Sequence, residues 1–414
     1  MKRRVVVTGL GMLTAVGNDV ATTWQSLLAG KSGGGMITRF DITRFDVKFA
    51  CELKGFDVTQ YMERKEAKRS DAYTQYAVAA STQAMQDAGL SEPGSFDPER
   101  CGVIIGSGIG GLRTFEDQCE TYFKSGPGRV SPFFIPMFIG DIAAGVVSMH
   151  FQCKGPNYAV VSACATSAHA IGDATRTIQY GDADIMIAGG SEAAVGPMAI
   201  SGFANMGALS NRNDSPETAS RPFDATRNGF VLGEGAGIVV LEELEHALKR
   251  GAKIYGEVAG YAATGDAFTL TGQPDAHEGL QRSMRRALAD ANLKPSDVQY
   301  INAHGTSTPL NDPNESAAIR AVFGEHAETV SVSSTKSATG HMLGAAGSVE
   351  FIACVMAIRD GQIPPTINYQ VPDPECDLDY TPNVPKARTV DVAISNSSGF
   401  GGHNVTLALR RYVA

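Results

Sequence analysis

Closely spaced cysteines are absent from this sequence. The chain has seven cysteines, an odd number, and no two lie within four residues of each other: Cys51, Cys101, Cys119, Cys153, Cys164, Cys354 and Cys376. This spacing argues against a disulfide framework and against a zinc knuckle, and it is typical of proteins in a reducing compartment. We therefore expect a cytoplasmic protein.

An excess of positive charge and a long uninterrupted apolar run are also absent. The net charge is −9, which argues against nucleic acid as a general partner. The apolar segment 133–151 contains Asp141 and two glycines, so it predicts core or interface rather than a membrane span. The apolar run Val5–Val7 is soon followed by Gly9, which favours a first strand and turn over a signal peptide. These features predict no membrane partner.

The chain does contain an alternation of short Val/Ile-rich runs and helical patterns. Its 414 residues suffice for roughly two to three domain-sized units. Strands alternating with helices predict an α/β fold with buried sheets. The expected strands include Val5–Val7, Val103–Ile105, Ala159–Val161, Ile185–Ile187, Ile238–Leu241, Tyr300–Ile301 and Val330–Val332. The clear helical patterns are Asp71–Ala88, Ala165–Tyr180, Gly279–Ala291 and Ser348–Arg359.

The two parts of the chain have similar local patterns. Residues 161–164 lead through small residues into a helical pattern, and residues 332–336 lead through hydroxyl residues and a glycine-rich stretch into another. The segment Gly251–Tyr255 resembles the start of a second half of the chain. We therefore predict a duplicated α/β unit with halves at residues 1–250 and 251–414, and with the site where the halves meet.

Cys164 is the strongest candidate for a nucleophile. The β-type run Tyr158–Val161 ends in small residues, and the cysteine then precedes a run of helix formers. This order predicts a strand, a tight turn and a helix, with the thiol at the start of the helix. Unpaired N–H groups and the positive end of the helix dipole favour a thiolate there. The alternative is a buried cysteine that acts as a small hydrophobic residue, and the segment alone leaves both open.

Two of the eight histidines lie on loops suited to chemistry. His304 follows the apolar run Tyr300–Ile301 on a Gly/Thr loop, and His341 lies on a turn flanked by glycine. Loops after strands are where α/β folds place reactive groups, and histidine can exchange protons with a carbonyl oxygen near neutral pH. Each could instead cap a turn. Five other histidines, His277 among them, lack such a setting.

Lys336 follows three hydroxyl residues, and two explanations fit it. A desolvated lysine can form a Schiff base with a carbonyl substrate. The alternative, which we favour, is an ordered charge in a polar network, paired with Glu350 on the following helix.

Two glycine-rich loops have different expected roles. Gly106–Gly111 matches G-x-G-x-x-G after a strand, which is the pattern of a dinucleotide site. It lies far into the chain, and no acidic residue ends a strand at the expected distance, so we predict close backbone packing near the pocket instead. In Ser397–Asn404, glycines would let backbone N–H groups approach a ligand oxygen.

Lys65, Lys68 and Arg69 form a basic cluster in an acidic protein. Their spacing of i, i+3 and i+4 predicts that they share one helical face. Such a face is usually only solvated, but here it could dock an acidic partner.

The candidate residues follow one another in a distinctive order: Cys164, His304, Lys336, His341 and then the loop Gly399–Gly402. This order resembles the β-ketoacyl-[acyl-carrier-protein] synthases of fatty-acid elongation, in particular the synthase II type, over nearly the whole chain. Further motifs that carry the resemblance begin at Gly106 (GSGIGG), Ser131 (SPFF), Ser220 (SRPFD), Gly229 (GFVLGEGAG), His304 (HGTSTP) and Ser333 (SSTKSATGH).

The resemblance implies a thiolase-like fold, with two βαβ-based halves in a five-layered αβαβα core, and a homodimer. It implies that Cys164 accepts an acyl chain from acyl carrier protein as a thioester. Malonyl carrier protein would then lose CO2, and the resulting carbanion would attack this thioester to give a 3-oxoacyl chain. No metal or redox cofactor is implied, because the phosphopantetheine arm arrives with the carrier protein.

The resemblance also implies roles for further residues. His304 and His341 would stabilise the enolate, and Lys336 and Glu350 would order the surroundings of the histidines. Backbone N–H groups of Cys164 and Phe400 would form an oxyanion hole, and Phe400 would gate the acyl pocket. Ile109 would limit acyl-chain depth. The other implied substrate contacts are Phe203, Thr306, Thr308, Gly399 and Gly401. The implied carrier-docking residues are Lys65, Lys68, Arg69 and Arg129.

Three positions depart from the common synthase II pattern. Gly207 stands where that pattern has an arginine, so one charge for carrier docking is missing. His403 lies in the glycine-rich loop where many members have threonine, and Leu310–Pro313 is unusual after the histidine loop. These departures bear on acyl-chain preference and carrier affinity rather than on the core chemistry.

Four other functions are to be weighed against this one. A polyketide-type ketosynthase would use the same residues on another acyl substrate, although a chain without appended modules favours fatty-acid synthesis. A non-catalytic partner subunit would lack the nucleophile. A coenzyme A thiolase would need a second late cysteine, but Cys354 and Cys376 lie outside any glycine-rich turn. A dinucleotide-binding oxidoreductase depends on Gly106–Gly111 alone.

Overall fold

Ten strands pair into one continuous sheet in the computed structural model, which describes residues 2–92 and 94–413. The strand order is β10-β9-β13-β14-β8-β1-β7-β6-β4-β5. The first set is β1 (Val5–Leu13), β4 (Cys101–Gly106), β5 (Asn157–Tyr158), β6 (Ile185–Glu192) and β7 (Gly235–Glu243). The second set is β8 (Gly256–Gly265), β9 (Tyr300–Asn302), β10 (Ser331–Ser333), β13 (Val392–Gly399) and β14 (His403–Arg410). The sets join through the short pairing of β1 with β8 at Val6 and Val7.

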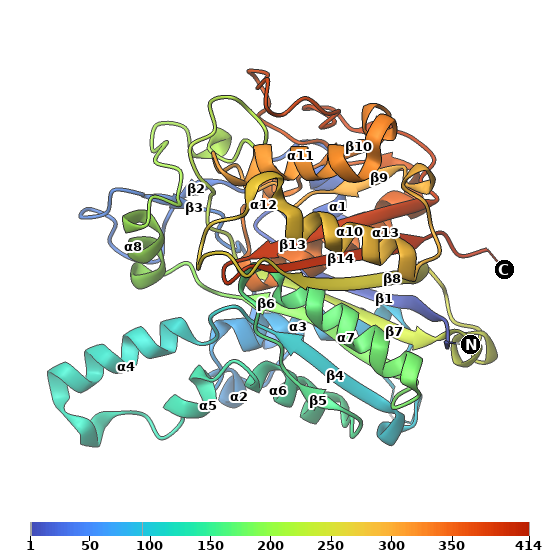
Figure 1. Cartoon of the computed structure of the whole chain (residues 1–414). Coiled ribbons are helices and arrows are strands. Elements are labelled where there is room, and N and C mark those ends of the chain that lie inside the picture. Colours follow the sequence, from blue (N-terminus) through green and yellow to red (C-terminus); the bar gives the residue numbers. More distant parts are fainter. Residues whose placement is uncertain (1, 93, 414) are drawn as a thin grey trace.

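Helices form three layers around these two sets of strands (Figure 1). The central layer is α7 (Thr166–Tyr180) and α13 (Ala346–Asp360), which contact each other and strands of both sets. The first set is covered on its outer face by α3 (Ala72–Asp87) and α6 (Ile142–Phe151), and the second by α10 (Glu278–Asp290) and α11 (Asn311–Phe323). The order helix, sheet, helix, sheet, helix confirms the predicted five-layered α/β fold.

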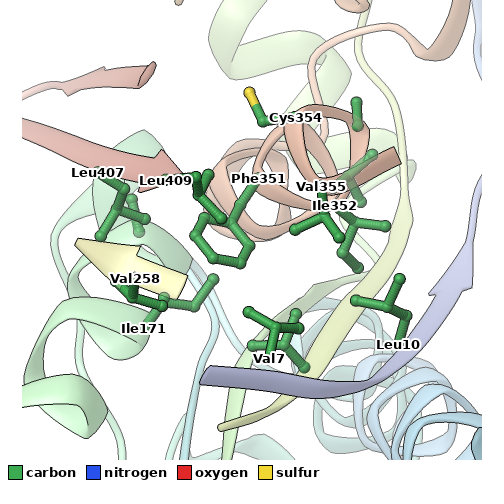
Figure 2. Packing of buried hydrophobic residues seen from close by; sticks show 14 of the residues in the cluster. Val7, Leu10, Ile171, Val258, Phe351, Ile352, Cys354, Val355, Leu407 and Leu409 are labelled. Carbon is green, nitrogen blue, oxygen red and sulfur yellow. The ribbon is translucent and has the colours of Figure 1, made fainter. Parts of the chain in front are cut away.

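The core between the two sets of strands is built around α13 (Figure 2). Nearly every residue of this helix is buried, as expected of a helix that is apolar on all sides. Phe351 and Val355 lie in one cluster with Val7 and Leu10 of β1 and with Leu407 of β14. Each such side chain contributes about 1.5–3 kcal/mol through burial, so α13 holds the two sets together.

The predicted helices are confirmed, with ends shifted by one or two residues. The start of α3 is fixed because the side chain of Asp71 accepts a hydrogen bond from the N–H of Tyr73. The predicted strand Ala159–Val161 is wrong, since only Asn157–Tyr158 pair with β4. Beyond them, the N–H of Ser162 donates to the hydroxyl of Thr166, which turns the chain into α7.

The remaining elements are short or lie at the periphery. An arm made of α4 (Leu112–Ser125) and α5 (Phe134–Phe138) projects from the body of the molecule (Figure 1). Within the described residues, no helix is long and apolar enough to cross a membrane. The other helices are α1 (Val20–Leu28), α2 (Arg64–Ala67), α8 (Pro197–Asn205), α9 (Leu244–Lys249) and α12 (Lys336–Thr339). Two small antiparallel pairs lie outside the main sheet: β2 (Gly35–Met36) with β3 (Phe49–Ala50), and β11 (Gln362–Ile363) with β12 (Lys386–Ala387).

The prediction that Lys65, Lys68 and Arg69 share one helical face is wrong. Helix α2 ends at Ala67, so only Lys65 belongs to it. The chain must leave the helix there because Asp71 caps the next helix a few residues later. All three basic side chains are nevertheless exposed.

Candidate active site

A cavity of about 290 Å³ lies where the N-terminal ends of the two central helices meet. Its wall comes from both parts of the chain and contains a cysteine and three histidines. The lining residues include Cys164, Phe203, Phe230, His277, His304, Thr306, Thr308, His341, Leu343, Gly399 and Phe400. The cavity is therefore both apolar and supplied with a few convergent polar groups, as is usual for substrate sites.

Cys164 lies in a tight turn, Ala163–Ala165, that leads directly into α7. The turn is strained, because Ala163 has a φ of 51°, in the left-handed region that residues with a Cβ rarely adopt. Cys164 is 8% exposed and is part of the cavity lining. A Cβ atom at Gly399 would lie 3.1 Å from the backbone nitrogen of Cys164, so the glycine-rich loop packs against the turn.

The expectation that the helix start favours a thiolate at Cys164 is wrong, because burial outweighs it. Burial raises the pKa of the thiol to about 12, and the nearby charge of Lys336 opposes this only in part. The thiol is therefore protonated near neutral pH. Its proton must leave as the sulfur attacks.

The rings of His304 and His341 are 5.4 Å apart, centre to centre, and nearly perpendicular. Burial, reinforced by the charge of Lys336, lowers the pKa of both rings well below the usual value, so both are neutral. The ammonium nitrogen of Lys336 lies 3.4 Å from Nδ1 of His304. Because an ammonium can only donate, Nδ1 is the acceptor and the proton of the neutral ring is on Nε2. His304 is thus held as a hydrogen-bond donor.

The pairing of Lys336 with Glu350 is confirmed. The two side chains form a buried ion pair, at 1% and 2% exposure, in a layer behind the cavity. Burial raises the pKa of Glu350 to about 7, against the opposing effect of Lys336. Lys336 is not part of the cavity lining, which argues against the Schiff-base alternative.

His277 also lines the cavity, although its place in the sequence did not indicate a role in the site. It is fully buried, its backbone has a φ of 46°, and its Nε2 lies 3.8 Å from the carboxylate of Asp266. The segment that carries it reaches the cavity from the start of α10, far from either histidine loop. No strand-end signal marks this position, and only its φ and burial reveal it.

Apart from the docking residues, the other candidate residues divide into two groups. Phe203, Thr306, Thr308, Gly399 and Phe400 line the cavity, and the hydroxyls of the two threonines are 2.9 Å apart. A second group is not part of the cavity lining: Ile109 packs on the apolar cluster that contains Cys164, while the N–H of exposed Gly401 donates to the carbonyl oxygen of Leu270. Neither Cys354 nor Cys376 lines the cavity, which argues against a thiolase.

The candidate docking residues lie away from the cavity lining. Lys65 and Arg69 border a second cavity of about 340 Å³ together with Glu63 and Glu66. The guanidinium of Arg69 is 4.4 Å from the ring centre of Phe133, at the returning limb of the arm. Arg129 is exposed in the short turn between α4 and α5. The basic cluster is thus interleaved with carboxylates.

The glycine-rich loop Gly106–Gly111 serves close packing, as predicted. A Cβ at Gly106 would lie 2.3 Å from the carbonyl oxygen of Val160, and a Cβ at Gly111 would lie 2.3 Å from that of Met137. Any larger residue would push these backbones apart. The loop therefore has no free face for a dinucleotide phosphate.

Comparison with known proteins gives one consistent family. Residues 2–247 match the family model described as beta-ketoacyl synthase, N-terminal domain, and residues 255–370 match the C-terminal domain. A protein of Synechocystis sp. named 3-oxoacyl-[acyl-carrier-protein] synthase 2 is 54% identical over 411 residues, which cover 99% of both chains. The Coxiella burnetii protein of the same name is 51% identical over 410 residues, again 99% of both.

Solved structures agree with this result. One is a chain from the complex of a type II polyketide synthase acyl-carrier protein with its ketosynthase bound to the hexaketide. It superposes with a TM-score of 0.93 at 38% identity and covers 100% of both chains. A beta-ketoacyl synthase from Burkholderia phymatum gives the same TM-score at 36% identity and the same coverage.

Proposed function

Because this chain belongs to the beta-ketoacyl synthase family, we propose that Cys164, His304 and His341 carry out the condensation reaction of that family. The enzyme is an acyltransferase: it condenses an acyl chain with malonyl-acyl carrier protein and releases a 3-oxoacyl-acyl carrier protein in fatty-acid elongation. The observation that carries the assignment is that the three side chains line one cavity and come from both parts of the chain.

The first half-reaction loads the acyl chain. The sulfur of Cys164 attacks the thioester carbon of the acyl carrier, the new S–C bond forms, and the bond to the pantetheine sulfur breaks. The proton of the buried thiol ends on the departing pantetheine sulfur, so no proton is gained or lost overall. The N–H groups of Cys164 and Phe400 stabilise the oxyanion, and such donors typically contribute about 10²–10³ in rate.

The second half-reaction makes the carbon–carbon bond. His304 and His341 donate hydrogen bonds to the carbonyl oxygen of the malonyl thioester. As CO2 leaves, its bonding electron pair passes to the α-carbon and the carbonyl oxygen becomes negative. Both rings are neutral, so they stabilise this charge without giving up a proton. The α-carbon attacks the acyl thioester, the S–C bond breaks, and the released thiolate of Cys164 takes up one proton from solvent.

The remaining residues hold the substrates. Thr306 and Thr308 contact the phosphopantetheine arm, and Phe203 lines the acyl channel. Ile109 limits the depth of that channel, and Phe400 moves with Gly399 and Gly401 to admit the chain. Lys336 and Glu350 keep His304 in its donor form. The reaction needs no metal or redox cofactor, because decarboxylation supplies the electron pair and no group is oxidised.

The carrier protein docks through Lys65, Lys68, Arg69 and Arg129. All four side chains are exposed, and an acidic partner would complement them. Gly207 on the cavity rim supplies no charge, so docking depends more on the α2 region.

A second copy of the chain packs on the exposed apolar side chains of the arm, giving a homodimer. Tyr122 and Phe123 are 49% and 83% exposed, and Ile135 is 56% exposed on the same arm. Exposed aromatic residues grouped in this way mark protein interfaces. The two halves of each protomer are residues 1–250 and 251–414, and the enzyme acts in the cytoplasm.

Intact-protein mass measurement tests the assignment of the nucleophile. Incubation with an acyl carrier protein should add one acyl group to the wild type and none to Cys164→Ala. Cys164→Gln should form no product but still decarboxylate malonyl carrier protein, because the amide mimics the acylated thiol. An acyl adduct on Cys164→Ala would contradict the proposal.

A polyketide-type ketosynthase is the second candidate, favoured by the likeness to the chain from the type II polyketide complex. The reaction product distinguishes a polyketide-type ketosynthase from a fatty-acid enzyme. Repeated condensation without reduction would give a poly-β-keto chain, whereas a fatty-acid enzyme stops after one 3-oxoacyl product when no reductase is present.

A further inference from the structure

The carboxylate of Glu192, the last residue of β6, is completely buried and accepts four hydrogen bonds. One oxygen accepts from the hydroxyl of Ser107 at 2.8 Å and from the N–H of Ile109 at 3.3 Å. The other accepts from the N–H of Gly108 at 2.8 Å and from the N–H of Gly344 at 2.9 Å. A single side chain thus ties two distant loops together.

One of these loops borders the substrate site, because Leu343 lines the cavity. Ile109 and Leu343, the neighbour of Gly344, pack in the apolar cluster that also contains Cys164. The backbones of Gly108 and Gly344 are so close that a Cβ at Gly344 would lie 2.3 Å from the nitrogen of Gly108. Glu192 therefore ties together two loops whose side chains pack on the apolar cluster around Cys164.

The four donors around Glu192 require a side chain that offers hydrogen-bond acceptors and no donors. A carboxylate has only acceptor sites, which match four donors. A glutamine of the same shape would turn an NH2 group toward two of these donors and lose their bonds. Burial alone would favour the neutral acid and raises the pKa of Glu192 to about 7, while the hydrogen bonds favour the anion.

We propose that Glu192 is a positioning residue that sets the depth of the acyl pocket by holding Ile109 and Leu343 in place. This inference rests on the proposed function, since it concerns the chain that is loaded on Cys164. It assigns chain-length selection to a buried charge outside the cavity as well as to the apolar side chains that face the substrate.

The test compares condensation rates with a long-chain and a medium-chain acyl carrier protein. In Glu192→Gln the loop is released, so the long-to-medium rate ratio should rise by about tenfold or more, because each lost hydrogen bond to a charged group corresponds to at least about that factor. Ile109→Ala should raise the ratio in the same direction. The double variant should give no further rise, because Glu192 acts through Ile109.

Two further variants make the result decisive. Glu257→Gln makes the same change at a buried carboxylate that pairs with Arg4 and Arg410, and it should leave the ratio unchanged. Ser107→Ala removes one donor and keeps the carboxylate, and it should raise the ratio less than Glu192→Gln does. If Glu192→Gln does not fold, Ser107→Ala decides alone.

An unchanged ratio in a folded Glu192→Gln, or in Ser107→Ala when the former is insoluble, would overturn the inference. Additive effects in the double variant would also overturn it. Lack of condensation by the wild type would instead defeat the proposed function. Condensation with the medium-chain carrier protein should persist in Glu192→Gln, which separates loss of positioning from general damage.

Discussion

The ammonium group of Lys336 lies between two partners, Nδ1 of His304 at 3.4 Å and the carboxylate of Glu350. This contact links a buried ion pair to the tautomer of a histidine in the cavity. An ordinary structural ion pair would affect stability alone. Here the pair also determines which nitrogen of His304 can donate.

Lys336→Met should affect both properties. The loss of the ammonium leaves Glu350 buried without its partner, which should lower the free energy of unfolding by about 3–5 kcal/mol. It also frees the tautomer of His304, so decarboxylation should slow even in the protein that remains folded. Urea denaturation and CO2 release measure the two effects.

The double variant Lys336→Met/Glu350→Leu is the control for that prediction. It removes both charges, so stability should largely recover while decarboxylation stays slow. Recovery of both would show that His304 does not depend on Lys336.

His304→Ala and His341→Ala should each slow condensation by about 10²-fold or more, the scale of one lost oxyanion donor. The negative charge they stabilise arises on the malonyl carbonyl, so acylation of Cys164 should survive better. Single-turnover acylation and CO2 release separate the two steps. If both variants acylate as poorly as Cys164→Ala, the histidines serve the first half-reaction instead.

The charge reversal Lys65→Glu/Lys68→Glu should raise KM for acyl carrier protein. Exposed charges mainly accelerate encounter, and salt screens them, so the loss should be largest at low ionic strength. Kinetics across a salt series measure this. A small pantetheine thioester should react as with the wild type.

Lys294→Glu, at another exposed lysine, is the matched control for the docking variant. It changes one charge on a different element and should leave KM nearly unchanged. Equal losses for the carrier and the small thioester would point to damaged folding and would contradict docking at α2.

Asp184 should make stability depend on pH in acid. Arg100 and Arg3 bind its carboxylate and lower its pKa to about 2, below the ordinary value. A lowered pKa means that the stabilisation is complete at neutral pH and is lost as the pH falls through about 4 to about 2. Asp184→Asn should therefore be less stable by about 1–2 kcal/mol at pH 7, and this gap should close in acid.

Urea denaturation of both proteins from neutral to acid pH checks that prediction. Asp182→Asn, at an exposed neighbour, should show no such gap. A constant difference at every pH would show that the amide disturbs packing rather than charge.

Local signals in the sequence were enough for the helices and for the turn at Cys164. The helical periodicity and the capping residue Asp71 predict α3. Small residues before a run of helix formers predict the turn at Cys164. The predicted strand at Ala159–Val161 is wrong because β5 ends at Tyr158: Val160 beyond it packs against the core, and Val161 is 63% exposed. The sequence does not predict the place of His277 because no strand-end pattern precedes it, and it does not predict that of Glu192 because the partners of Glu192 are distant in the sequence. No periodicity predicts that one carboxylate will meet Ser107 and Gly344.

The meeting of α7 and α13 has a consequence for folding. The nucleophile precedes one of these helices and His341 precedes the other, and the strands that enclose them come from opposite ends of the chain. Contacts between such distant segments form late, because closing long loops costs entropy before any burial repays it. Catalytic competence should therefore be the last property that a refolding chain regains, after its secondary structure and most of its compactness.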